Sequence, residues 1–219
     1  TYGGSEANVA VSLANFGIPT EFVTRLPDNA VARACIASLR ANGLGTEGIV
    51  FGGKRIGLYF LESGAAFRNS NVVYDREGSS FATLRPGMID WEKIFSDAGW
   101  FHWSGIAAAL SQDGADACRE ALEIADRMGL TISCDLNFRK KLWNYGSSAA
   151  EVMQPLVQYS DVIFGAEPEY KEILGIQPVG FKAVDAEDTT FEANLPAFED
   201  FGRRVVELVP RCQKAFLEL

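Results

Sequence analysis

The sequence predicts an α/β fold built around a parallel β-sheet. From about residue 86 onward, short strand-like apolar runs alternate with amphipathic helical segments, a spacing typical of parallel strands joined by crossover helices. Before that point, one β-α step is followed by a β-rich stretch at residues 48–84, where glycine, serine and asparagine separate the strands. A chain of 219 residues, 47% of them hydrophobic, is long enough to bury a sizeable core in one domain.

The first third of the chain carries local signals for helices and short strands. Apolar residues recur at helical spacing after the paired glycines Gly3 and Gly4, and Asn29 has a side chain preferred at helix N-termini. The expected elements are, in order, a helix at Ser5–Phe16, a strand at Glu21–Leu26, a helix from Asn29 through Ala41, and antiparallel strands at Ile56–Glu62 and Asn71–Arg76.

The rest of the chain predicts repeated strand-helix units. The expected elements are a short helix after Asp90, a strand at Trp100–Ser104, a helix at Ser111–Gly129, a strand at Leu130–Asp135, a helix through about Gln158, a strand at Asp161–Phe164 and a helix at Glu167–Leu174. The polar, acidic stretch Gln177–Pro196 predicts a loop. The segment Phe198–Leu217 predicts an amphipathic helix that Pro210 kinks.

Charge and composition restrict the kinds of partner. A formal net charge of −9 argues against nucleic acid, which requires clustered basic residues, and no apolar run approaches the roughly 20 residues that a membrane span needs. The four cysteines form no CxxC or Cys/His cluster, and the chain shows no charged-then-apolar leader. We therefore expect a cytoplasmic protein with reduced thiols and a small-molecule partner.

Polar residues follow three of the predicted strands, at Ser104–Ile106, Asp135–Arg139 and Gly165–Glu169. In an open parallel sheet, ligands lie beyond the carboxyl ends of the strands, so these segments are expected to line one rim. Asp135, Asn137 and Arg139 alternate, which places their polar groups on one side of an extended segment. The guanidinium suits a carboxylate or phosphate. A strand-end turn with an exposed arginine is the open alternative.

The first third holds further candidates. Gly3 and Gly4 before a helix allow a ligand to approach the backbone, and Asn8 lies one turn into that helix, although an ordinary turn and cap explains this pattern as well. Tyr74 and Arg76 share one face of a predicted strand. This face either contacts a ligand or is the solvent-exposed face of a small sheet.

Two other features are more readily structural. His102, the single histidine, lies mid-strand between aromatic residues, so we expect a core residue rather than a catalytic base. Glu167 and Glu169 at a strand-to-helix junction suit Mg²⁺ bound through water, but the helix dipole alone also favours acidic residues there.

Several motifs resemble, in order and spacing, those of the ribokinase-like (PfkB) carbohydrate kinases. They are Gly3-Gly4-Ser-Glu-Ala-Asn8, Gly57-Leu-Tyr59-Phe-Leu-Glu62, Ser104-Gly105-Ile106, and Asp135-Leu-Asn137-Phe-Arg139 followed by Leu142-Trp143. The last motif is most similar to the branch that phosphorylates 2-keto-3-deoxygluconate, the 2-dehydro-3-deoxygluconokinases. The resemblance covers about residues 1–176.

The resemblance implies a three-layer αβα fold with a small β lid, here residues 48–84, and residues 1–219 as part of one kinase domain. It implies phosphoryl transfer from ATP, with Mg²⁺, to a primary hydroxyl of a sugar or acid sugar, and a homo-oligomer formed through the lid. The implied sugar contacts are Gly4, Asn8, Tyr59, Tyr74, Arg76, Ile106 and Arg139. Asn137 and Glu169 fall on the phosphate and ATP side, where Glu169 would reach the metal through water.

This sequence departs from the family pattern in two places. The family's Asn-x-x-Glu motif appears as Ala166-Glu167-Pro168-Glu169, so the asparagine is absent. The Gly-Ala-Gly-Asp motif that carries the catalytic base is also absent, and no catalytic residue is assigned. We therefore expect the kinase domain to be incomplete in this sequence, at the N-terminal first strand and in the C-terminal catalytic part.

Three alternatives remain open at the level of sequence. A fructokinase-like or ribokinase-like enzyme would not need two arginines around its sugar. A non-catalytic sugar-binding protein would explain the absent catalytic motif. A dinucleotide-binding oxidoreductase is the weakest alternative, because no GxGxxG follows a strand.

Overall fold

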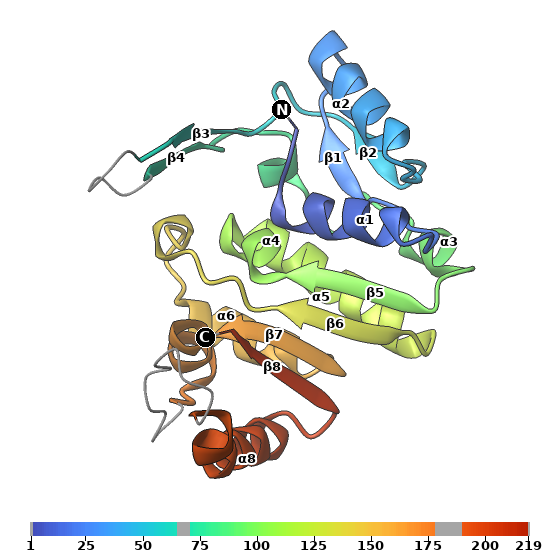
Figure 1. Ribbon diagram of the computed structural model, residues 1–219. Helices are drawn as coiled ribbons and strands as arrows, with labels where there is room; N and C mark the ends of the chain where they lie inside the picture. The colour runs from blue at the N-terminus through green and yellow to red at the C-terminus, as the bar shows by residue number, and fades with distance from the viewer. Residues whose placement is uncertain (1, 65–70, 178–189, 219) are drawn as a thin grey trace. The chain divides into compact units, whose positions relative to one another are not determined.

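The computed structural model describes residues 2–64, 71–177 and 190–218, with side chains throughout except at residues 190–194. The chain divides into two compact units, Thr1–Asp90 and Trp91–Leu219 (Figure 1).

The first unit begins with two helices packed on a short parallel pair of strands. Its elements are α1 (Ser5–Asn15), β1 (Thr24–Leu26), α2 (Ala30–Ala41) and β2 (Ile49–Phe51). As predicted, the Asn29 side chain caps α2, accepting a hydrogen bond of 3.0 Å from the Ala32 amide. The predicted strand at Glu21–Leu26 is shorter in the structure, since Glu21 forms only an isolated bridge with Gly45.

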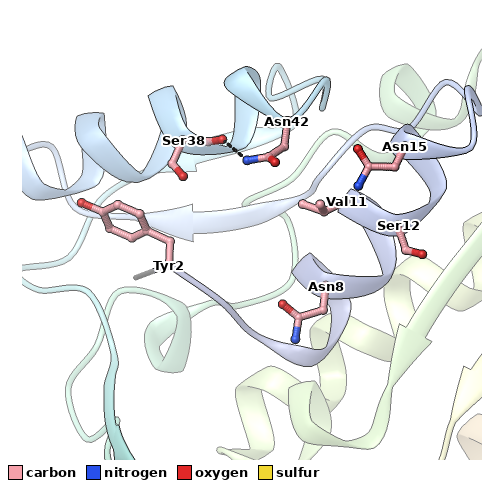
Figure 2. A pocket seen from close by; sticks show the side chains of 7 residues that line it. All are labelled: Tyr2, Asn8, Val11, Ser12, Asn15, Ser38 and Asn42. Atoms are coloured by element: carbon pink, nitrogen blue, oxygen red, sulfur yellow. Dashed lines mark hydrogen bonds between the residues drawn. The ribbon is translucent and has the colours of Figure 1, made fainter.

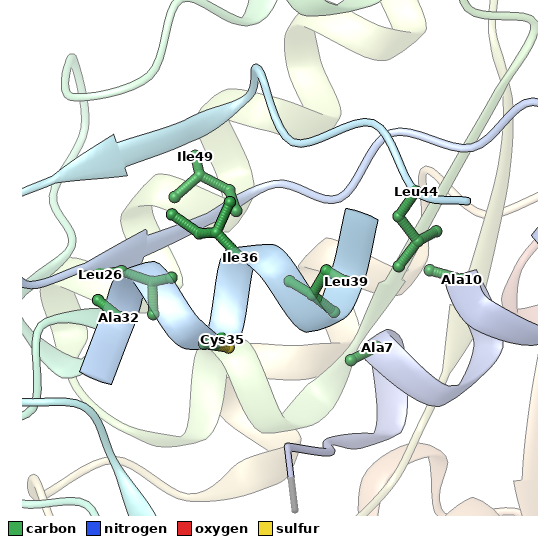
Figure 3. Close-up of a cluster of buried hydrophobic side chains, with 9 residues drawn as sticks. All are labelled: Ala7, Ala10, Leu26, Ala32, Cys35, Ile36, Leu39, Leu44 and Ile49. Atoms are coloured by element: carbon green, nitrogen blue, oxygen red, sulfur yellow. The ribbon is translucent and has the colours of Figure 1, made fainter. Parts of the chain in front are cut away.

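A small apolar core holds these four elements together (Figure 3). Small alanine side chains from α1 and α2 and larger aliphatic side chains from α2, the strands and Leu44 make up this core. The buried members are Ala7, Ala10, Leu26, Ala32, Cys35, Ile36, Leu39, Leu44 and Ile49.

The β-rich stretch forms a two-stranded antiparallel ribbon, β3 (Leu58–Glu62) with β4 (Asn71–Asp75). All five residues of β3 are exposed. Arg55 holds the base of the ribbon through two hydrogen bonds to the Asp75 carboxylate, at 2.7 and 2.5 Å. A short 3-10 turn, η1 (Phe81–Thr83), follows. The two antiparallel strands predicted from the sequence are confirmed.

The second unit is a four-stranded, all-parallel sheet in the order β5-β6-β7-β8. Its strands are β5 (Trp100–Ser104), β6 (Thr131–Asp135), β7 (Val162–Ala166) and β8 (Lys214–Glu218). The intervening helical segments are α3 (Trp91–Phe95), α4 (Gly105–Ala109), α5 (Gln112–Arg127), η2 (Lys140–Leu142), α6 (Ala149–Val157), α7 (Glu167–Glu169), the π-helical turn η3 (Tyr170–Leu174) and α8 (Thr190–Leu208). The predicted α/β class with a parallel sheet is confirmed.

One face of this sheet is fully covered. Ile132 and Cys134 of β6 and Ile163 of β7 have no exposed surface. Figure 1 shows α5 and α6 lying along one side of the sheet. Burying a large aliphatic side chain stabilises a fold by roughly 1.5–3 kcal/mol, so this face supplies much of the stability of the second unit.

The C-terminal predictions need correction. The predicted helix over Phe198–Leu217 is wrong beyond Leu208, where α8 ends, and Lys214–Glu218 forms strand β8 instead. Pro210 therefore lies after the helix and kinks nothing. Pairing with β7 decides the outcome, because that strand offers hydrogen bonds that no local pattern reveals. Of the predicted loop Gln177–Pro196, residues 178–189 lie outside the described residues, and Thr190–Pro196 belong to α8.

Within the part of the chain that the structure describes, no helix is long and apolar enough to cross a membrane.

Candidate functional site

The candidate site of the second unit lies at the carboxyl ends of β5, β6 and β7. The register pairs Ser104 with Asp135 and Asp135 with Phe164, so the three strands end side by side. The polar segments that follow each strand therefore meet at one edge of the sheet, as parallel pairing requires. We call this edge the rim and define it as Ser104–Ile106, Asp135–Arg139 and Gly165–Glu169.

Gly105 permits the backbone at the first rim segment to lie against the second. A Cβ added at Gly105 would lie 2.3 Å from the Leu136 carbonyl oxygen and 2.9 Å from Met153 Cε. Any side chain there must push one of these groups away. Ser104 begins α4, and its hydroxyl accepts a hydrogen bond of 3.3 Å from the amide of Ile106. The predicted sugar contact Ile106 thus lies on the rim, with its amide already engaged.

The segment after β6 is turned rather than extended. Asn137 has a left-handed backbone, with φ of 42°, and is 5% exposed. Asparagine tolerates this conformation better than most residues with a Cβ. Its side-chain amide donates a hydrogen bond of 2.9 Å to Asp135 Oδ2. The expected alternation of three polar groups along a straight strand is therefore wrong, and a turn brings Asp135 and Asn137 into contact instead.

The same turn directs Arg139 back toward the end of β7. Arg139 Nη1 lies 3.2 Å from Glu169 Oε1, and it also donates to the Phe138 carbonyl at 3.1 Å. The other carboxylate oxygen, Oε2, accepts a hydrogen bond of 3.0 Å from the Ala166 amide. The side chain of Arg139 is 45% exposed and that of Glu169 is 12% exposed. A half-exposed cation is thus attached to a nearly buried carboxylate on the rim.

Sequence reasoning selected both residues but missed this ion pair. The bond from the Ala166 amide to Glu169 could have been anticipated, because a glutamate at the third position of a helix often accepts a hydrogen bond from the backbone amide of the N-cap residue. Ala166 has no side-chain acceptor, so only this half of a capping box exists. The contact with Arg139 joins residues 30 positions apart and has no local signal.

In the first unit, three predicted sugar contacts lie near one another. A Cβ added at Gly3 would lie 3.2 Å from the Tyr59 hydroxyl and 3.7 Å from Asn8 Oδ1, so both side chains approach this backbone. Gly4 has φ of 155° and ψ of 155°, a conformation essentially restricted to glycine. Gly4 is therefore needed for its backbone conformation. Gly3 is needed because a side chain there would crowd Tyr59 and Asn8.

Tyr74 lies on β4, and Arg76 directly follows the end of that strand. Tyr59 pairs directly with Tyr74 across the two strands. The guanidinium carbon of Arg76 lies 4.5 Å from the centre of the Tyr74 ring, a cation–π distance. The ribbon thus presents two tyrosines and one arginine as a group.

A shallow groove of about 490 Å³ opens between α1 and α2 (Figure 2). Its lining consists of uncharged side chains, most of them amides or hydroxyls, namely Tyr2, Asn8, Val11, Ser12, Asn15, Ser38 and Asn42. Asn8 is the predicted sugar contact among them. Carboxamides and hydroxyls suit neutral hydroxyl groups rather than a ligand anion.

His102 does not lie on the rim. Its Nδ1 is 2.8 Å from Ser133 Oγ, which also accepts a hydrogen bond of 2.8 Å from Trp100 Nε1. Ser133 is 2% exposed, so it cannot reach a substrate as a nucleophile. Burial also raises the pKa of the neighbouring Cys134 thiol well above its usual value, which keeps it protonated. These groups offer no hydrolase chemistry.

The rim provides little for direct metal coordination. Among the described residues, no group of three or more His, Cys, Asp or Glu side chains could hold a metal ion. Both Glu169 oxygens already accept hydrogen bonds. Mg²⁺ in kinases keeps several waters and relies on substrate phosphates with one or two carboxylates. The residues present therefore fit a hydrated ion reached through water and do not form a protein cage.

Comparison with known proteins agrees with this architecture. The sequence pattern of the pfkB family carbohydrate kinases matches residues 1–197. A 2-dehydro-3-deoxygalactonokinase from Haloferax volcanii is 32% identical over 203 residues, which are 93% of this chain and 61% of that protein. Fructokinase-1 of Oryza sativa subsp. japonica is 31% identical over 178 residues, 81% of this chain and 54% of the relative.

A solved structure shows the same fold. The crystal structure of 2-dehydro-3-deoxygluconokinase from Thermotoga maritima superposes with a TM-score of 0.84 at 40% identity, covering 95% of this chain and 60% of that one. The chain therefore spans between about half and three fifths of the length of these relatives. The family match over residues 1–197, together with this shared fold, shows that the chain belongs to the pfkB family of carbohydrate kinases.

Proposed function

We propose that the protein phosphorylates a primary hydroxyl of an acid sugar, with 2-keto-3-deoxygluconate as the first candidate and ATP as the phosphoryl donor. The observation that carries this proposal is the position of Arg139, a half-exposed guanidinium at the carboxyl end of β6. A cation on the rim suits the carboxylate that separates acid sugars from neutral sugars. Relatives named for 2-dehydro-3-deoxy sugar acids support the same substrate class.

We assign the proposed roles to the residues of each unit in turn. In the first unit, Gly4, Asn8, Tyr59, Tyr74 and Arg76 would contact the sugar, and the uncharged groove lining next to Asn8 suits its hydroxyls. In the second unit, Ile106 and Arg139 would do so. Asn137 and Glu169 would face the phosphates, with Glu169 reaching Mg²⁺ through water. Phosphoryl transfer depends mainly on such positioning and on charge neutralisation by the metal.

A neutral-sugar kinase is the second candidate. The pairing of Arg139 with Glu169 neutralises the guanidinium, which a site for fructose would tolerate. The 31% identity to the rice fructokinase points in the same direction. A third candidate is a sugar-binding protein without turnover, which is favoured by Ala166 in place of the family's asparagine.

We further propose self-association through the β3–β4 ribbon, which would serve as the lid. Four apolar side chains of β3, Leu58, Tyr59, Phe60 and Leu61, are 43–60% exposed. Ribbons of two strands are marginal in water unless another surface covers them. We also propose that the protein is cytoplasmic, because all four cysteines are free thiols, as is usual in that reducing compartment.

The test is ADP release by the protein as its gene encodes it, with ATP and Mg²⁺, and with 2-keto-3-deoxygluconate, fructose or ribose as acceptor. Turnover at least tenfold faster with the acid sugar supports the proposal. Faster turnover with fructose supports the second candidate. Saturable sugar binding in calorimetry without ADP release supports the non-catalytic alternative.

A further inference from the structure

We propose that Glu169 is a positioning residue that holds the Arg139 guanidinium in place, so that its Nε–Nη2 edge faces the carboxylate of an acid sugar. This inference rests on the proposed function and names a residue that would make the site specific for acid sugars. Both residues, and every group that they contact, belong to the second unit.

The first step is that one corner of the guanidinium is anchored. Arg139 Nη1 donates to two acceptors, Glu169 Oε1 at 3.2 Å and the Phe138 carbonyl at 3.1 Å. A nitrogen with two hydrogens has no donor left after these bonds. The guanidinium is therefore held through Nη1, while its other two nitrogens extend away from the anchor.

The second step is that the anchor itself is rigid. Glu169 Oε2 accepts a hydrogen bond of 3.0 Å from the Ala166 amide at the end of β7, and the side chain is only 12% exposed. Gly165 leaves room for it, since a Cβ there would lie 3.3 Å from Oε2 and 3.0 Å from Leu136 Cδ1. Glu169 is thus fixed to the strand end and cannot follow a mobile arginine.

The third step is that a complete binding edge remains open. Among the described residues, Arg139 Nε and Nη2 make no hydrogen bond, and the side chain is 45% exposed. These two nitrogens carry parallel N–H groups at the spacing of a carboxylate, so they can bind both of its oxygens at once. Neutral sugars lack a group that fits this edge. The contact therefore favours acid sugars.

The pair also explains how a neutralised arginine can still select an anion. The negative charge of Glu169 repels a ligand carboxylate. This repulsion weakens the binding of any anion that does not bond directly to Arg139. A guanidinium already fixed in its bound orientation loses less conformational freedom when the ligand arrives. We expect this preorganisation to outweigh the repulsion and to strengthen acid-sugar binding about tenfold.

The experiment measures the affinity for 2-keto-3-deoxygluconate by calorimetry, without ATP and without Mg²⁺, so that no metal role of Glu169 contributes. It uses the protein as its gene encodes it. We expect Glu169→Ala to weaken binding about tenfold and Arg139→Ala to weaken it further. The double variant should bind no more weakly than Arg139→Ala, because a positioning residue has no effect once its arginine is gone. The isosteric Glu169→Gln serves if the alanine variant fails to fold, with a loss of about threefold expected.

Two controls isolate the effect. Glu172, an exposed glutamate in the next turn, provides the matched variant Glu172→Ala, which should bind like the parent protein. If fructose binds measurably, its affinity should not change in any Glu169 variant, whereas general damage to the rim would lower both affinities.

Each result decides the matter. Equal or tighter acid-sugar binding by Glu169→Ala and Glu169→Gln would overturn the inference while leaving the proposed function intact. An additive double variant would also overturn it, since the two residues would then act independently. If the parent protein binds no acid sugar, the proposed function itself fails, and the inference fails with it.

Discussion

The two ends of the four-stranded sheet each hold an arginine paired with an acidic side chain, but the two arginines use their hydrogen-bonding groups differently. At the amino ends of the strands, Arg211 bonds to Asp161 through Nε at 3.0 Å and Nη2 at 3.2 Å. It also bonds to Asp126 through Nη1 and to the Leu130 carbonyl through Nη2 at 3.3 Å. At the carboxyl ends, Arg139 uses Nη1 alone.

This difference separates a structural arginine from one that can bind a ligand. Asp161 precedes β7, and its carboxylate also accepts the Ile132 amide at 2.8 Å, so the group around Arg211 ties three strand ends together. Hydrogen bonding to Asp161 and Asp126 raises the pKa of Arg211, as expected for a saturated cation. Arg139 keeps two nitrogens open toward solvent. Unused hydrogen-bonding capacity, rather than the presence of charge, distinguishes the functional end.

The largest predicted effect tests this comparison directly. Arg211→Met should lower the free energy of unfolding by about 3 kcal/mol, because it leaves the nearly buried Asp161 carboxylate without its cation. Arg139→Met should cost about 1 kcal/mol, since the rim is partly solvated. Urea denaturation measures both. Equal losses for the two variants would show that the ends do not differ as described.

A second prediction concerns the clearance beneath the rim. Gly105→Ala should destabilise the protein by about 2 kcal/mol, because its Cβ would press on the Leu136 carbonyl. Gly99→Ala is the matched control, since an added Cβ at Gly99 meets nothing within 4 Å. Thermal unfolding compares the two. A Gly105→Ala variant as stable as the control would mean that α4 and the segment after β6 adjust freely.

A third prediction concerns the turned backbone that distinguishes the rim. Asn137→Ala and Asn137→Gly both lose the hydrogen bond to Asp135, but only alanine is strained at φ of 42°. We expect the alanine variant to be less stable than the glycine variant by about 1 kcal/mol. Equal stability in urea denaturation would argue against a left-handed residue at this position.

The smallest predicted effect concerns Glu151, a glutamate that caps the start of a helix as Glu169 does. Glu151 accepts a hydrogen bond of 2.8 Å from the Ser148 amide, as Glu169 does from the Ala166 amide, but Glu151 is exposed and pairs with no arginine among the described residues. Hydrogen bonds from the Ser148 amide and hydroxyl lower its pKa. The stabilisation from the carboxylate should therefore be present above its unfolded pKa and disappear as pH falls through the lower folded pKa.

Glu151→Gln tests this small effect. The variant should melt slightly below the parent protein at pH 7, and the two melting temperatures should converge at pH 3. A constant difference between the two proteins at both pH values would contradict an ionised cap.

Local signals predicted much of the fold correctly. The strand at Trp100–Ser104, the cap at Asn29 and the two strands of the ribbon depend on nearby residues, and the structure agrees with each. The error at Lys214–Glu218 has the opposite cause, because that segment becomes a strand only by pairing with β7. Its alternating residues have no helical or strand preference strong enough to decide the question alone.

The sequence alone determined the fold class, the family motifs and the identity of the candidate rim residues. The order of apolar runs predicts most of the strands and helices, and parallel strands must bring their carboxyl ends to one edge. Only the tertiary structure decided how those residues interact. The left-handed backbone at Asn137 turns the chain after β6, and the contact between Arg139 and Glu169 joins the ends of β6 and β7. Such contacts depend on distances in space that spacing along the chain does not specify.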